Sequence, residues 1–132
     1  MTAHASGKFK YHSWEENTYA DIDDGRKLTR ASVKQVFSGD IEGDGTVEWL
    51  MYYRPDQTAD FIGLQHVAGR IGERSGSFVL QTTGTFDGRE AKGEWSVVPG
   101  SGTGDLQGLR GTGGFRAPHG PEAAITLDYD LE

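Results

Sequence analysis

Apolar and polar residues alternate along this chain in runs of six to twelve residues, and turn signals separate the runs. A period of two is typical of strands that bury one face, whereas an amphipathic helix needs a period near 3.6. No segment of useful length has the helical period. About eight strands joined by short turns fit in the 132 residues, and this length limits the chain to one domain, residues 1–132.

The Asp87-Gly88 pair marks the clearest hairpin, because it stands between two alternating runs. Asp-Gly favours a two-residue turn of type I′, in which both central residues have positive φ. Such a turn predicts the cross-strand pairs Gly84–Ala91, Thr82–Gly93, Leu80–Trp95 and Phe78–Val97. A one-residue slip would reverse both faces. We therefore expect these inward side chains: Phe78, Leu80, Trp95 and Val97.

The other runs complete a meander of antiparallel strands. Besides the hairpin, we expect strands over Lys8–Trp14, Leu28–Phe37, Thr46–Arg54, Ala59–Gly69, Arg110–Ala117 and Ala123–Leu131. Polar or glycine-rich segments at 21–25, 38–45, 99–104 and 118–121 are expected to be turns or loops, and Asp105 is expected to cap one short helical turn. Meanders of this length usually close into a barrel, which removes exposed strand edges. The predicted fold class is therefore all-β, a single antiparallel eight-stranded β-barrel.

Charge and composition exclude several classes of function. The net charge of −7 is unfavourable for binding nucleic acid, which requires clustered Lys and Arg against phosphate. The absence of cysteine excludes thiolate metal sites, iron–sulfur clusters and a cysteine nucleophile. No apolar run is long enough to span a membrane, and the first residues lack the apolar core of a signal peptide. We therefore expect a cytoplasmic protein with no nucleic-acid or membrane partner.

Three further patterns are incomplete as cofactor or metal motifs. The glycine-rich segment 100–104 lacks the helix that must follow a phosphate-binding loop. The segment 40–45 is similar to the start of a calcium loop, but Met51 occupies the twelfth position, where a glutamate is required. No metal-binding spacing relates the four histidines, which are His4, His12, His66 and His119. We expect neither a metal nor a cofactor.

Four segments carry a resemblance to a known family: Arg74–Gln81, Trp95–Gly104, Leu106–Gly111 and Thr126–Asp130. Through them the chain resembles an uncharacterised bacterial family of small β-barrels, a domain of unknown function. That family is similar in fold to allene oxide cyclase, a calycin-like barrel isomerase that acts on an oxidised fatty acid. The resemblance implies an eight-stranded barrel with a partly apolar interior and no cofactor. It implies no catalytic residue, because none of the cyclase's residues is mapped onto this sequence.

Glu48 is the predicted catalytic residue. It lies in a run with bulky residues on both faces, so alternation alone does not choose its orientation. If it faces inward with Leu50 and Tyr52, burial would raise the pKa of its carboxyl group and suit it to proton transfer. The alternative places Glu48 in water and turns the other face inward, with Val47, Trp49, Met51 and Tyr53.

The predicted substrate-binding residues lie on neighbouring strands. Gln65 and His66 are adjacent in one run, so one of them must face inward, Gln65 with Phe61 and Val67 or His66 with Ile62 and Leu64. A lone histidine in a strand is more often structural or solvated than catalytic. The following aromatic side chains either line a pocket or fill the core: Tyr52, Trp95 and Phe115.

Two classes of function remain open for a barrel that binds a small molecule. The first is a cofactor-free isomerase or cyclase that holds an apolar, oxygenated molecule, similar to an oxylipin or a polyketide, and uses Glu48 for acid–base or electrostatic help. The second is a non-catalytic carrier or sensor of a small hydrophobic ligand. A third outcome is a filled barrel, because eight strands leave room only for side chains or one small ligand. A homo-oligomer is compatible with the sequence, since barrel relatives often associate.

Overall fold

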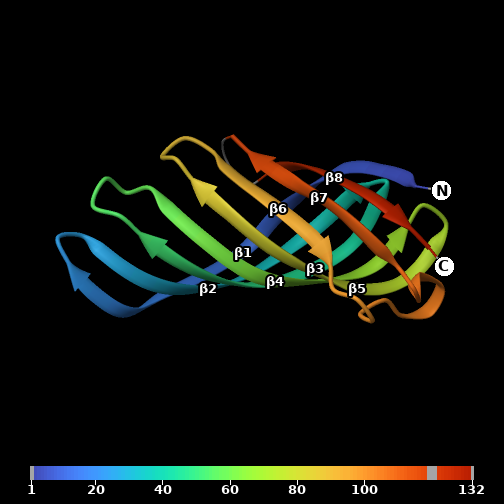
Figure 1. Cartoon of the computed structure of the whole chain (residues 1–132), viewed down its shortest axis with the longest axis horizontal. Helices are drawn as coiled ribbons and strands as arrows, with labels where there is room; N and C mark the ends of the chain where they lie inside the picture. The colour runs from blue at the N-terminus through green and yellow to red at the C-terminus, as the bar shows by residue number, and fades with distance from the viewer. Residues whose placement is uncertain (1, 119–121, 132) are drawn as a thin grey trace.

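A computed structural model describes residues 2–118 and 122–131 and shows eight antiparallel strands in one closed barrel (Figure 1). Each strand pairs with the next along the chain, and the last pairs with the first. The strands are β1 (Ala3–Asp23), β2 (Arg26–Gly39), β3 (Ile41–Tyr53), β4 (Ala59–Ile71), β5 (Arg74–Phe86), β6 (Ala91–Val97), β7 (Arg110–Ala117) and β8 (Glu122–Asp130). The predicted fold class is confirmed.

The segment between β6 and β7 closes one end of the barrel. It contains a short 3₁₀ turn, η1 (Gly104–Leu106). Leu106 and Leu109 are 0% and 2% exposed and belong to the core. The Ser77 amide on β5 donates to the hydroxyl of Thr103, at 2.9 Å, which holds the segment in place. Figure 1 shows this segment at the same end as the two termini, whereas the β1–β2, β3–β4 and β5–β6 turns lie at the opposite end.

Asp105 does not cap η1 as predicted. The residue before the turn is Thr103, and its side chain makes no capping hydrogen bond. Asp105 lies inside the turn, where its carboxylate accepts a hydrogen bond from the Ser75 amide at 3.3 Å. The carboxylate thus helps to hold the segment against β5 and does not satisfy the turn's own amides.

β1 is longer than the sequence predicted. It continues through the expected loop to Asp23, is paired with β2 from Gly7 onward, and leaves a turn only at 24–25. Three register shifts interrupt this pairing, so no single alternation runs through the strand. β3 likewise begins at Ile41, inside the expected loop at 38–45, because Ile41 is 1% exposed and joins the core.

The β5–β6 hairpin has a different register from the predicted one, with the pairs Phe86–Ala91, Gly84–Gly93, Thr82–Trp95 and Leu80–Val97. The loop therefore has four residues, 87–90. The Asp87 carboxylate accepts hydrogen bonds from the amides of Arg89 and Glu90, both at 2.9 Å, and within this loop only Gly88 has positive φ. A type I′ turn needs two such residues in succession. The shift of two residues preserves the faces, so the inward orientation is confirmed for Phe78, Leu80, Trp95 and Val97.

Inward glycines make room for aromatic rings on the adjacent strands. A Cβ atom at Gly63 would lie 2.5 Å from the Trp49 ring, one at Gly84 would lie 2.4 Å from the Phe61 ring, and one at Gly93 would lie 2.3 Å from the Phe115 ring. Each ring therefore lies over a neighbouring strand at a position where any other residue would occupy its space. This close approach accounts for part of the high glycine content, 20 of 132 residues.

The part of the chain that the structure describes contains no helix long and apolar enough to cross a membrane. The predicted loop at 118–121 falls almost entirely outside the described residues, and His119 is among those left out.

Candidate ligand-binding site

A cavity of about 470 Å³ opens at the end of the barrel opposite η1. Its volume lies within the range of about 300–1,000 Å³ that is typical of sites for small organic molecules. Its wall includes residues from the β5–β6 loop and the end of β7, which places the opening at the end with the hairpin turns. The lining residues are Phe9, Tyr11, Trp14, Gln35, Trp49, Met51, Tyr53, Phe61, Phe86, Gly88, Arg89, Ala91, Phe115, Ala117 and Pro118.

Aromatic rings form most of the cavity wall. Phe115 is at the centre of this cluster, with its ring centroid 5.4 Å from that of Phe9, 6.1 Å from that of Trp49 and 6.2 Å from that of Phe61. Trp49 and Phe61 also meet edge to face, at 5.0 Å between centroids. These separations are typical of favourable aromatic pairs. The wall is therefore apolar and well packed, and it presents ring faces and edges to a ligand.

A bulge in β1 places a carboxylate next to this cavity. Phe9 and Tyr11 face inward, but the register shift after Tyr11 moves the inner face to Trp14 and Glu16, which pair with inward positions of β2. The signal in the sequence is the spacing of three between Tyr11 and Trp14, which breaks the alternation. Glu16 is not among the predicted site residues, because the first predicted strand ends at Trp14.

Glu16 accepts three hydrogen bonds from inward side chains. Its Oε2 atom accepts from the Tyr53 hydroxyl and from the Thr29 hydroxyl, both at 2.7 Å. Its Oε1 atom accepts from the indole Nε1 of Trp14 at 3.0 Å. Trp14 and Tyr53 line the cavity. Glu16 thus fixes the positions of two aromatic walls at the mouth.

The same hydrogen bonds hold Glu16 ionised and Tyr53 neutral. Burial raises the pKa of Glu16, but the hydrogen bonds from Tyr53, Thr29 and Trp14, with the nearby Lys27 ammonium, lower it further than burial raises it. Burial, and next the hydrogen bond to the Glu16 carboxylate, raise the pKa of Tyr53 well above its usual range. Neither group is thus tuned to exchange a proton near neutral pH.

Two glutamines form a polar pair in the otherwise apolar interior. Gln35 and Gln65 are 2% and 0% exposed. The Gln65 Nε2 atom donates to the Gln35 Oε1 atom, and Gln35 lines the cavity while Gln65 lies behind it. Among the described residues, the Gln65 Oε1 atom and the Thr82 hydroxyl are buried without a hydrogen-bond partner. Among the described lining residues, Gln35 is therefore the buried polar side chain, and Gln65 supports it from behind.

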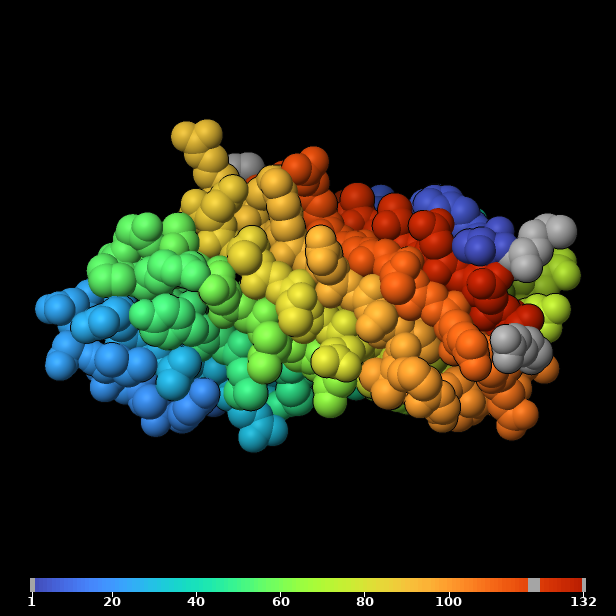
Figure 2. Space-filling view, viewed as in Figure 1, coloured from blue at the N-terminus to red at the C-terminus, as the bar shows by residue number. Residues whose placement is uncertain are grey.

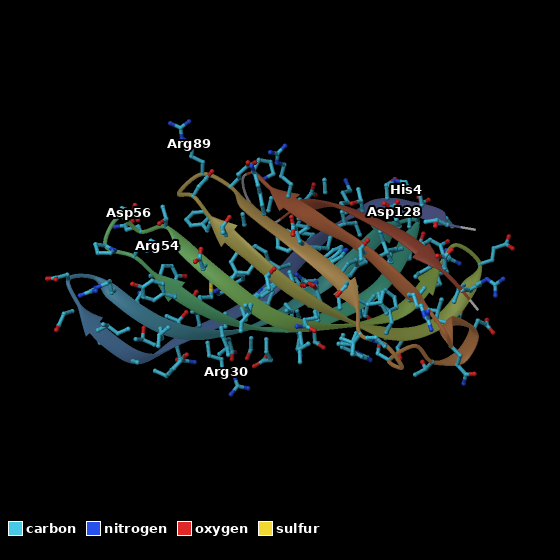
Figure 3. The ribbon with its side chains drawn as sticks, viewed as in Figure 1. His4, Arg30, Arg54, Asp56, Arg89 and Asp128 are labelled. Atoms are coloured by element: carbon cyan, nitrogen blue, oxygen red, sulfur yellow. The ribbon has the colours of Figure 1, made fainter. Side chains whose placement is uncertain are left out.

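Glu48 lies on the outer face of the barrel. Its carboxylate accepts hydrogen bonds at 2.9 Å from the Ser32 hydroxyl and from the Arg30 guanidinium, and its side chain is 48% exposed. Figure 3 shows Arg30 pointing away from the barrel. The Ser32 hydrogen bond, with the Arg30 ion pair, lowers the pKa of Glu48 despite slight burial. The inward orientation of Glu48 is thus wrong, because β3 buries its other face. The confirmed alternative has these residues inside: Val47, Trp49, Met51 and Tyr53.

The predicted substrate-binding residues are divided between the two faces. Phe115 lines the cavity. Gln65 faces inward behind Gln35, and Trp95 is 3% exposed in the core, where its Nε1 atom donates to the Thr126 carbonyl at 3.0 Å. Tyr52 and His66 lie on the outer face, because their inward neighbours Tyr53 and Gln65 occupy the alternate positions. The structure does not bring these five residues together, and their role in binding stays a prediction.

A second hollow, of about 540 Å³, lies at the same end of the barrel and shares Tyr53 and Phe86 with the cavity. Its cationic side chains have partners. Arg54 pairs with Asp60 at 2.6 Å, Arg26 lies 3.8 Å from Asp24, and the Lys27 ammonium lies 5.1 Å from the Tyr53 ring centroid. Figure 3 shows Arg54 and Asp56 on the β3–β4 turn at this end. This hollow is thus a polar rim beside the apolar cavity.

Acid should remove the stability that Glu16 contributes. Because the folded-state pKa of Glu16 lies below its usual value of 4.5, its hydrogen bonds stabilise the fold above that value and are lost as the pH falls through the lowered pKa. We expect Glu16→Gln to be less stable than the wild type near neutral pH, and the difference to shrink on acidification. Urea unfolding from about pH 7 to about pH 3 measures both. Glu15→Gln, on the same strand but exposed, is the matched control. A difference that stays constant with pH would contradict this role.

Fold and site together define a small β-barrel with an apolar, aromatic-walled cavity open at one end. The family described as "Protein of unknown function (DUF3224)" matches residues 5–129, and the chain belongs to this family. The expected membership of an uncharacterised family of small barrels is thereby confirmed, whereas the relationship to allene oxide cyclase stays a prediction.

A solved structure has the same architecture over the whole chain. It is a DUF3224 protein with unknown function from Shewanella oneidensis MR-1, which is 26% identical and aligns over 100% of this chain and 99% of its own, with a TM-score of 0.81. A search of curated proteins found no match.

The outer shape of the molecule is elongated along the barrel axis, as the space-filling view shows (Figure 2).

Proposed function

We propose that this protein is a non-catalytic binder, a carrier or sensor, of a small apolar molecule that enters the open end of the barrel. The observation that carries the proposal is the 470 Å³ cavity walled by aromatic rings. A barrel that served only as a scaffold would gain packing energy by filling this space with larger side chains. Small residues instead occupy the mouth, at Ala91 and Ala117.

Binding without catalysis agrees better with the titratable groups than the isomerase or cyclase does. Glu48 is outside the barrel, and Glu16 is held ionised by three donors while Tyr53 is held neutral. General acid–base catalysis requires a group whose pKa lies near the working pH and which is free to exchange a proton with the substrate. The isomerase or cyclase hypothesis therefore lacks a suitable acid or base among the described lining residues, and we place it second.

The test is a fluorescence titration with prodan, a neutral naphthalene dye whose emission shifts to the blue in an apolar environment. We expect saturable binding to the wild type. Ala117→Trp should weaken the affinity by about tenfold or more, because an indole at this position would fill the mouth. Thr112→Trp adds the same side chain to the exposed outer face of β7 and should leave the affinity unchanged. Equal affinity in both variants, or no binding to the wild type, would contradict the proposal.

A further inference from the structure

We infer that the ligand is a neutral apolar molecule that carries a hydrogen-bond acceptor, such as a carbonyl oxygen, and that the amide nitrogen of Gln35 donates to it. This inference rests on the proposed function and specifies the ligand of the same cavity. It starts from a side chain that, alone among the described lining residues, is both polar and nearly fully buried: Gln35, at 2% exposure.

The neighbours of Gln35 determine which of its atoms is left for a ligand. The Gln65 Nε2 atom donates to the Gln35 Oε1 atom. That oxygen is directed toward β3, because a Cβ atom at Gly45 would lie 3.2 Å from it. The Gln35 Nε2 atom is not among the fully buried side-chain atoms without a partner, as expected of an amide nitrogen that faces the open cavity. A ligand that fills the cavity without an acceptor would leave this donor unpaired, which costs free energy, whereas a ligand that carries an acceptor avoids that cost.

Gln65 orients this donor from behind. It is fully buried on β4, and its own Oε1 atom has no partner among the described residues. The hydrogen bond from the Gln65 Nε2 atom engages the oxygen of Gln35 and so leaves the amide nitrogen of Gln35 as the group for the cavity. Gln65 is therefore a positioning residue, and Gln35 is the residue that contacts the ligand.

The charges around the cavity favour a neutral ligand. The ionised Glu16 carboxylate lies directly behind Tyr53 on the wall. Arg89 is the cationic residue among those that line the cavity, and Figure 3 shows its side chain extending away from the barrel. An anionic group would thus enter an apolar space near the Glu16 carboxylate, and no buried cation among the described lining residues would offset its charge, which is unfavourable.

Three naphthalenes of matched size test the inference: 2-acetonaphthone, 2-isopropenylnaphthalene and 2-naphthoate. The first two differ only by C=O against C=CH₂. We expect the ketone to bind the wild type about tenfold more tightly than the alkene, the gain of one buried hydrogen bond. Calorimetry or tryptophan quenching gives the affinities. The naphthoate should bind more weakly than the ketone.

The Gln35→Met variant keeps the length of the side chain but cannot donate. We expect it to bind ketone and alkene equally, whereas Gln81→Met, on the exposed outer face of β5, should keep the preference. The infrared C=O stretch of the bound ketone gives a second readout that needs no variant. In the wild type it should lie below its value in cyclohexane, as a hydrogen-bonded carbonyl requires.

Each other outcome separates the inference from the proposed function. If ketone and alkene bind the wild type equally, the cavity binds ligands but Gln35 does not select them, and the inference is overturned. Tighter binding of the naphthoate would overturn it too and would assign the carboxylate to the cationic side chains of the polar rim, Arg26, Lys27 and Arg54. If none of the three binds, the proposed function itself fails.

Discussion

Replacing Phe115 by alanine is expected to lower the free energy of unfolding by about 3 kcal/mol, near the lower end of the range for a buried Phe→Ala change. The Phe115 ring is 8% exposed and contacts the rings of Phe9, Trp49, Phe61 and Trp95. Its removal breaks all four ring contacts. The loss stays near the lower end because one side of the ring already faces the cavity.

Urea unfolding of Phe115→Ala and Phe86→Ala measures this effect with a matched control. Phe86 also lines the cavity but is half-buried at the mouth, so we expect its replacement to cost clearly less. Equal losses for the two variants would show that Phe115 does not organise the aromatic cluster. The affinity for prodan should also fall in Phe115→Ala, because the wall loses its central ring.

The Gly93→Ala substitution is expected to destabilise the fold by about 1–3 kcal/mol, the usual cost of adding a methyl group to a filled space. The new Cβ atom would lie 2.3 Å from the Phe115 ring, with two further ring atoms within 2.9 Å. The ring must therefore move. Because it is held by its aromatic neighbours, its displacement disturbs the cavity wall.

A double-mutant cycle identifies the cause of this loss. In a Phe115→Leu background the aromatic ring is absent, so Gly93→Ala should cost much less than in the wild type. The coupling free energy should be about 1–2 kcal/mol, within the range for residues in contact. If the two changes are additive, the cost of Gly93→Ala comes from the backbone of β6 and not from the ring.

The fold could be predicted from the sequence because its main signal is local. Alternation and turn residues identify strands and faces, and the register of one hairpin is enough to orient its apolar side. The register itself was offset by two residues, since the Asp87 carboxylate binds backbone amides and stabilises a wider loop than Asp-Gly alone predicts. Loop geometry of this kind depends on a side-chain contact that alternation does not reveal.

The site was harder to predict, for two physical reasons. In β3 both faces carry aromatic residues, so period two could not tell whether Glu48 or Trp49 faces inward. In β1 a bulge after Tyr11 changes which residues of the strand face inward. The carboxylate that reaches the interior is therefore that of Glu16. Of the predicted binding residues, Phe115 lies in the cavity wall because its strand alternates without interruption.

Glu16 shows how the fold uses an interior carboxylate without leaving it reactive. Three donors surround it, and two of them belong to side chains that line the cavity. Charge-assisted hydrogen bonds are stronger than neutral ones, so this arrangement fixes Trp14 and Tyr53 at the mouth. A rigid entrance that takes no part in proton transfer agrees with the proposed carrier or sensor.

Methionine-methyl NMR tests the central claim most directly, because the chain has only two methionines and Met51 lines the cavity. With ¹³C-methyl methionine, the Met51 resonance, assigned by its loss in Met51→Leu, reports from the aromatic wall. On addition of prodan, we predict that this resonance shifts in proportion to the bound fraction measured by fluorescence. A Met51 resonance that does not move at saturating prodan would contradict binding inside the barrel.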